Sequence, residues 1–176
     1  MLAPLAPPSR PGQTGAPWPH RPALEAFHAA LFPVDYEPAF YDAVEAGHDG
    51  VFSFGLFEGR RGGGGGGGPP VLGHPPPPPP VAFVTARAVP WGELSTADLA
   101  VLGLTLPPGR VNRDGVVGGG GGGPADVAPS PPVAAVYVLT LGVPSPTHRR
   151  FGAGRALMAA VATRAAALGA GAVYLH

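Results

Sequence analysis

A short run of arginines and glycines, R-R-F-G-A-G-R from Arg149 to Arg155, has residue types that can bind phosphate. Arg149, Gly152 and Gly154 form the spacing R-x-x-G-x-G. Unpaired N–H groups at a helix N-terminus bind anions, glycines let the backbone approach a ligand, and guanidinium groups suit phosphate oxygens. Alone, the motif is more typical of a glycine turn in a solvated basic cluster. Between a predicted strand and a long predicted helix, it predicts a pocket for a pyrophosphate-bearing ligand.

His176, the last residue of the sequence, is a candidate for proton transfer. A residue at the carboxyl end of a parallel strand lies on the edge where α/β sheets place their ligands. Its unperturbed pKa of about 6.5 suits proton transfer at neutral pH. A frayed terminal histidine is the alternative interpretation. The other five histidines have no metal-ligand spacing, and the lack of cysteine excludes thiolate zinc ligation, disulfides and a cysteine acyl intermediate.

Three consecutive elements would position these residues. Val133 to Val143 predicts a half-buried strand, Gly154 to Leu168 an alanine-rich helix that Gly169 ends, and Ala172 to His176 a last strand. A strand, a helix and a strand in this order form a βαβ unit, which requires parallel pairing. The sequence therefore predicts that the arginine and glycine loop joins the first strand to the helix.

The first of these strands has two predicted faces and a glycine near its end. Period two places Tyr137, Leu139 and Leu141 on one face, and Val136, Val138 and Thr140 on the other. By itself, Tyr137 is an ordinary sheet aromatic. Gly142 marks the place where a bulge or a close backbone approach is expected. A bulge there would separate this strand from the next and free backbone groups for an extended ligand.

The upstream sequence predicts helices and then a hairpin. A first helix is expected over Pro22–Phe32, and a second short helix within Val34–Val44, with Glu37-Pro38 as its cap and a stop near Gly47. Strands are expected over Val51–Glu58 and Val81–Val89. Leu94–Leu104 predicts a turn or helix, with Ser95 and Thr96 as caps for Ala97–Leu102. The element order is helix, helix, strand, strand, insertion, strand, helix, strand. This order predicts an α/β fold.

Glycine and proline dominate the composition in local runs. The chain has 29 glycines and 26 prolines in 176 residues, concentrated in residues 1–22, 62–68, 75–80 and 118–123. Such runs cannot recover their ordering entropy by burial. We therefore expect a disordered, proline-rich tail over residues 1–22 and one domain over 23–176, with low-complexity insertions near 60–80 and 107–132. Seven prolines before residue 23 argue against a secretory signal, and the formal net charge of +0 gives no global field for nucleic acid.

Three separated blocks resemble one family, the GCN5-related N-acetyltransferases (GNAT), and within it N-alpha-acetyltransferases of the NatF type. The blocks are L-F-P-V-D-Y-E-P-A-F-Y from Leu31, V-Y-V-L-T-L-G-V from Val136 together with R-R-F-G-A-G, and V-Y-L-H from Val173. V-A-F-V-T-A-R from Val81, followed by a long insertion, is closer to plant and algal NatF than to NatE. The resemblance covers about 85 residues and implies a GNAT fold, a mixed central sheet flanked by helices.

The resemblance implies transfer of acetyl from acetyl-CoA to the α-amine of proteins that begin with Met and a hydrophobic or amphipathic residue, without a metal. Tyr137 and His176 match the family's catalytic residues. The residues matching its substrate contacts are Phe32, Tyr36 and Leu139, and those matching its acetyl-CoA contacts are Leu141, Gly142, Val143, Arg149, Arg150, Phe151, Gly152, Ala153, Gly154 and Arg155.

The sequence departs from the family pattern after His176, where the family continues with a helix, further strands and a membrane-binding segment. We therefore expect a C-terminally truncated chain of doubtful activity. Cytoplasmic placement is expected for this chain, and peripheral association with Golgi or plasma membrane only through that missing segment. Protein N-termini are the expected partners. A histone or lysine acetyltransferase, a catalytically silent CoA-binding remnant and a polyproline-based interaction protein remain alternatives.

Overall fold

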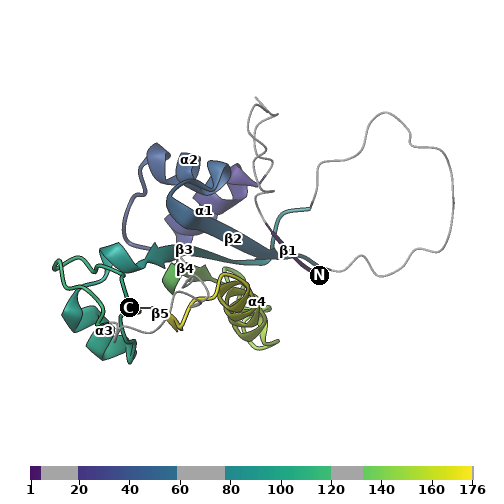
Figure 1. Cartoon of the computed structure of the whole chain (residues 1–176). Coiled ribbons are helices and arrows are strands. Elements are labelled where there is room, and N and C mark those ends of the chain that lie inside the picture. The colour runs from purple at the N-terminus through teal and green to yellow at the C-terminus, as the bar shows by residue number, and fades with distance from the viewer. Residues whose placement is uncertain (5–19, 59–77, 120–132, 176) are drawn as a thin grey trace, which may run out of the picture.

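A five-stranded sheet in the order β1-β2-β3-β4-β5 forms the centre of the protein. The computed structural model describes residues 1–4, 20–58, 78–119 and 133–175 (Figure 1). The elements are β1 (Leu2–Pro4), α1 (Arg21–Leu31), α2 (Pro38–Ala46), η1 (His48–Gly50), β2 (Val51–Leu56), β3 (Ala82–Pro90), η2 (Trp91–Glu93), α3 (Thr96–Leu102), β4 (Val133–Gly142), α4 (Ala153–Ala167) and β5 (Ala172–Tyr174).

Both predicted strand pairings are confirmed. β2 and β3 form the antiparallel hairpin, with Val51 opposite Arg87 and Leu56 opposite Ala82. β4 pairs with β3 antiparallel and with β5 parallel, so β4, α4 and β5 form the predicted βαβ unit. The sheet is therefore mixed, as the sequence predicted.

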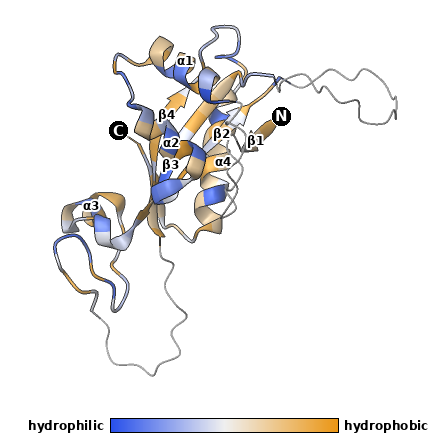
Figure 2. Ribbon diagram, turned by 90° about the horizontal axis from the view of Figure 1, so that it is seen from above, coloured by the Kyte–Doolittle hydropathy of each residue, from blue (hydrophilic) through white to orange (hydrophobic). Residues whose placement is uncertain are grey.

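Helices cover both faces of the sheet. α4 packs on one face, while α1 and α2 pack on the other (Figure 1), and Figure 2 shows that the strands are largely hydrophobic. α2 begins at Pro38 with Glu37 as its extended N-cap, which confirms the predicted cap, since a proline is favoured in the first turn of a helix. α3 has the predicted cap: the Ser95 hydroxyl accepts from the Asp98 N–H at 3.0 Å.

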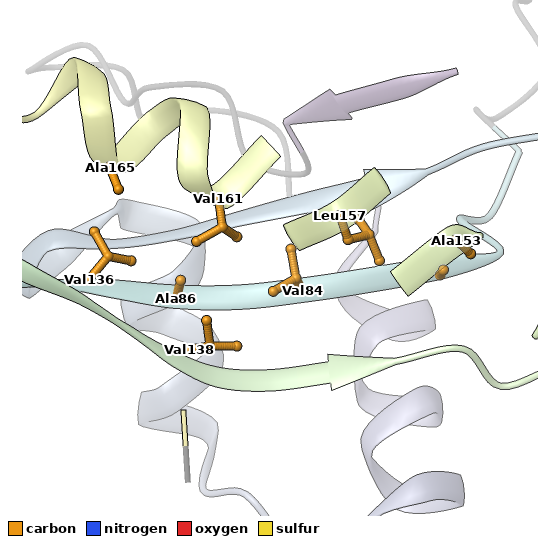
Figure 3. Packing of buried hydrophobic residues seen from close by; sticks show 9 residues of the cluster. Val84, Ala86, Val136, Val138, Ala153, Leu157, Val161 and Ala165 are labelled. Atoms are coloured by element: carbon orange, nitrogen blue, oxygen red, sulfur yellow. The ribbon is translucent and has the colours of Figure 1, made fainter. Parts of the chain in front are cut away.

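α4 packs on the sheet through a row of small and aliphatic side chains. Ala153, Leu157, Val161 and Ala165 recur every fourth residue and are all buried. A repeat of four residues keeps side chains on one helix face. In Figure 3 this row faces side chains from the two central strands, β3 and β4, which are Val84, Ala86, Val136 and Val138. This packing fixes the helix N-terminus relative to the end of β4.

The bulge in β4 lies at Leu139 and not at Gly142. The register passes from Thr85 opposite Thr140 to Ala86 opposite Val138, so Leu139 is the extra residue. The slip turns Thr140 toward α1, where its hydroxyl meets His28 Nε2 at 3.2 Å. The prediction that Thr140 shares a face with Val136 and Val138 is therefore wrong, because it assumed unbroken alternation.

The predicted close approach at Gly142 involves side chains. A Cβ on Gly142 would lie 2.5 Å from Phe83 Cε1 and 2.6 Å from Leu31 Cδ1. Gly142 is therefore the residue that lets the end of β4 lie against α1 and β3.

The ends of the predicted tail and of one predicted insertion are structured. Leu2–Pro4 pairs antiparallel with β2, and α1 begins at Arg21, so disorder over the whole of residues 1–22 is not what the structure shows. Strand pairing satisfies backbone groups there, even in a proline-rich sequence. Residues 107–119 form a turn in which the side-chain Oδ1 of the buried Asn112 accepts from the backbone N–H groups of Asp114 and Val116. Residues 5–19, 59–77 and 120–132 lie outside the described residues. Within the described part, no helix is long and apolar enough to span a membrane.

Candidate functional site

β4 pairs with β5 along the first half of its length. Ala135, Val136 and Tyr137 pair with Ala172, Val173 and Tyr174. From Val138 to Gly142, no strand among the described residues pairs with this edge. The described residues end at Leu175, one residue beyond the last pair, so the opening expected beside Gly142 stays a prediction. An unpaired strand edge presents N–H and C=O groups that an extended ligand can pair with.

The turn after β4 leads directly into α4 and contains the predicted phosphate-binding residues. Arg149 Nε donates to the Val143 carbonyl at 3.1 Å, which ties the turn to the end of the strand. Gly152, with a φ of 75°, is the N-cap of α4 and provides no side-chain cap. The first N–H groups of a helix have no partner within the helix. These groups are therefore available to an anion.

The space beside this helix N-terminus is free. A Cβ built on Gly152 or Gly154 would meet nothing within 4 Å, counted over the described residues. Arg149, Arg150 and Arg155 are exposed around it, whereas Ala153 is buried under the helix and Phe151 is 83% exposed. Residues 133–175 hold four arginines and no aspartate or glutamate. The open space, the uncapped helix and the positive charge together fit a pyrophosphate group.

Tyr137 belongs to the last residue pair between β4 and β5 in the described part of the chain. It is half-buried, and its ring stacks on Tyr174 with centroids 4.9 Å apart and an interplanar angle of 22°. Leu139, the bulged residue, is the next residue but one along β4 and packs beside α1 and α2. Leu141 lies further along β4 and is 37% exposed. His176, the other predicted catalytic residue, lies outside the described residues.

The loop between α1 and α2 contains two of the residues predicted to contact the substrate, Phe32 and Tyr36. The Tyr36 ring lies tilted by 31° against His28 with centroids 4.4 Å apart, and the Phe32 ring lies edge-on to Tyr36 at 6.1 Å. Burial raises the pKa of Tyr36, and the nearby charge of ionised Tyr137 raises it further. The structure therefore places Tyr36 and Tyr137, which are 101 positions apart in the sequence, within electrostatic reach of each other.

His28 lies beside Tyr36, and the sequence analysis did not single it out. It is fully buried, and its ring nitrogens lie 3.2 Å from the Tyr41 hydroxyl and 3.2 Å from the Thr140 hydroxyl. Burial lowers the pKa of His28 to about 4, so the ring is neutral at physiological pH. The sequence could have indicated that His28 is buried, because it follows Leu24 by four residues and so lies on the same face of the helix.

A pocket of about 250 Å³ lies between α1 and α2. Its lining includes His28, Tyr36 and Tyr41 together with the carboxylates of Glu25 and Asp35. Tyr36, one of the predicted substrate contacts, therefore also lines this pocket. Within the described part of the chain, no group of three or more histidine, cysteine, aspartate or glutamate side chains could hold a metal ion.

Comparison with solved structures identifies the fold. No protein-family model and no curated protein sequence matches this chain. Arabidopsis thaliana NAA60 in complex with acetyl-CoA superposes with a TM-score of 0.60 and 22% identity, over 99% of this chain and 74% of that chain. The same plant protein in complex with a bisubstrate analogue gives a TM-score of 0.55 and 23% identity, over 99% and 73%. The similarity to AAC(6')-Iy in complex with a bisubstrate analogue is lower, at a TM-score of 0.49 and 14% identity over 89% and 72%, and carries no argument.

The mixed five-stranded sheet flanked by helices is the GNAT, or acyl-CoA N-acyltransferase, fold. The fold prediction made from the sequence is therefore confirmed.

Proposed function

We propose that this chain is an N-terminal protein acetyltransferase that transfers acetyl from acetyl-CoA to the α-amine of proteins beginning with Met and a hydrophobic or amphipathic residue. The observation that carries the proposal is the N-terminus of α4 just after β4, which has no side-chain cap and is surrounded by exposed arginines. Similarity in fold to NAA60, a protein whose structure was solved with acetyl-CoA, supports it.

In this proposal the chain holds acetyl-CoA along β4 and α4. The backbone of Leu141, Gly142 and Val143 pairs with the pantetheine arm. The loop from Arg149 to Arg155 holds the pyrophosphate through the N–H groups of Gly152, Ala153 and Gly154 and through its guanidinium groups. When bound, acetyl-CoA supplies an activated acyl group as a thioester. Metal is not needed for attack on such an ester.

Transfer requires a base that deprotonates the substrate α-amine and residues that hold the amine in place. An α-amine has a pKa near 8, so a weak base is enough to give the neutral nucleophile. Tyr137, with His176, removes the amine proton through a water molecule. Overall, one amide bond forms at the α-nitrogen, the thioester bond breaks, and the sulfur leaves as the protonated thiol of CoA. Phe32, Tyr36 and Leu139 line the pocket for the initiator methionine.

Mass spectrometry of two matched peptides tests the proposal. One peptide begins with a free Met-Leu, the other is the same peptide with a blocked N-terminus, and both contain one internal lysine. We expect one acetyl group on the free peptide and none on the blocked one. Transfer to the lysine of both peptides would instead indicate a lysine acetyltransferase. Binding of acetyl-CoA without transfer would indicate a silent CoA-binding protein.

A further inference from the structure

Tyr174 of β5 is an aromatic neighbour of Tyr137 on the adjacent strand. The parallel register places the two residues directly opposite each other, and their rings stack at 4.9 Å. This pair is the last one between β4 and β5 in the described part of the chain. Tyr174 therefore limits the directions that the Tyr137 ring can take on that side.

The other side of Tyr137 is also fixed. Arg87 of β3 is its directly paired cross-strand neighbour, and such neighbours share one face of the sheet. The Arg87 guanidinium is itself held, because Nη2 donates to both carboxylate oxygens of Glu93 at 2.7 and 2.6 Å and Nε donates to the Asp49 carbonyl at 3.2 Å. Arg87, Tyr137 and Tyr174 thus form a row across three strands in which the tyrosine at the centre has an ordered neighbour on each side.

We propose that Tyr174 is a positioning residue for acetyl transfer, whose stacked ring holds the Tyr137 phenol in its productive orientation. This role rests on the proposed function, in which Tyr137 handles the amine proton. The ring of Tyr174 carries the role, and its hydroxyl does not. Burial raises the pKa of Tyr174, with smaller contributions from Asp98 and Tyr137, so this hydroxyl stays protonated and neutral at physiological pH.

Two substitutions separate the ring from the hydroxyl. Tyr174→Phe keeps the stacked ring, and Tyr174→Leu removes it while keeping an apolar side chain. We expect Tyr174→Phe to keep kcat within about twofold and Tyr174→Leu to lower it about tenfold, since small displacements of a catalytic group are costly. KM for acetyl-CoA should stay within about twofold in both, because the residues proposed to bind acetyl-CoA lie beyond the bulge.

A double-mutant cycle shows whether Tyr174 acts through Tyr137. In a Tyr137→Phe background, Tyr174→Leu should cause little further loss, because the group that it positions is already gone. Thermal melting of every variant, with kinetics measured well below the midpoint, separates positioning from loss of fold. If the leucine variant does not fold, Tyr174→Val makes the same test with a side chain that favours strands.

Each outcome decides the proposal. Full kcat in Tyr174→Leu, or additive losses in the cycle, would overturn the positioning role. An equal loss in Tyr174→Phe and Tyr174→Leu would also overturn it, because the hydroxyl would then be the acting group. If the unsubstituted chain transfers no acetyl group, the proposed function fails and this role fails with it. If that chain is active and only the ring proves dispensable, the proposed function stands and this role alone fails.

Discussion

At the scale of single residues, the buried histidine joins the two sides of the site. His28 contacts Thr140 in the bulged strand, Tyr41 in α2, and Tyr36 in the loop between α1 and α2, which contains the predicted substrate contacts. Five aromatic rings lie within 5.6 Å of its ring centroid, those of Phe32, Tyr36, Phe40, Tyr41 and Phe83. A neutral imidazole can donate from one nitrogen and accept at the other, and both neighbours are hydroxyl groups that can do either.

We expect this histidine to make the protein sensitive to mild acid. The pKa of His28 is lowered to about 4, below the value of 6.5 in the unfolded chain. Between these values only the unfolded state binds the proton, so stability is complete above pH 6.5 and falls as the pH drops toward 4. The full effect is roughly 2–4 kcal/mol, since one pKa unit corresponds to about 1.4 kcal/mol. Urea unfolding at pH 7 and at pH 4.5 measures it.

The control for this prediction is His28→Gln, which keeps two polar groups and cannot titrate. Its stability at pH 7 should be lower than that of the original chain, because the ring contacts are lost. Its further loss between pH 7 and pH 4.5 should be smaller. Equal losses over this pH range in both proteins would show that other groups cause the acid sensitivity.

At the scale of elements, two glycines at the two ends of the turn between β4 and α4 have opposite surroundings. A side chain on Gly142 would meet Phe83 and Leu31, whereas one on Gly154 would meet nothing within 4 Å among the described residues. Gly142→Ala should therefore lower the free energy of unfolding by about 1–3 kcal/mol through overpacking. Gly154→Ala should raise it by up to about 1 kcal/mol, because alanine favours the helix.

The same two variants connect the elements to binding. The open space at Gly154 is where the proposal puts the pyrophosphate, so Gly154→Ala should weaken acetyl-CoA binding while stabilising the fold. Urea denaturation and equilibrium binding on the same samples measure the two effects. A Gly154→Ala protein that is more stable and binds as well as the original would mean that a ligand does not use this space.

The sequence predicted the elements well and the bulge poorly. Period, capping residues and proline positions placed α3, α4 and the β2–β3 hairpin within one or two residues, because those signals are local. The bulge depends on contacts that are distant in the sequence: Thr140 meets His28, and Gly142 fits beneath Phe83 and Leu31. The phase of β4 beyond Val138 could not be read from alternation alone. The stacking of Tyr137 on Tyr174 was also not predicted, since it needs the exact register of β4 with β5.

At the scale of the whole molecule, the zero net charge hides a separation of charge. Residues 20–50, which form α1, α2 and the acceptor loop, hold six carboxylates and one arginine, whereas residues 133–175 hold four arginines and no carboxylate. In the structure α1 and α2 of the first segment cover one face of the sheet, and α4 of the second covers the other. The positive side suits a phosphorylated donor and the negative side suits a cationic amine, which agrees with the proposed reaction. The overall composition gave no sign of this arrangement.

The measurement that tests the central claim most directly is calorimetric titration of acetyl-CoA into the chain and into two arginine variants. Arg155 lies in the first turn of α4, and Arg164 lies in its last turn as a matched control. We predict one binding site, weakened at least about tenfold by Arg155→Ala, as expected for loss of a charged hydrogen bond, and changed less than about twofold by Arg164→Ala. No binding by the original chain, or equal weakening in both variants, would contradict the account.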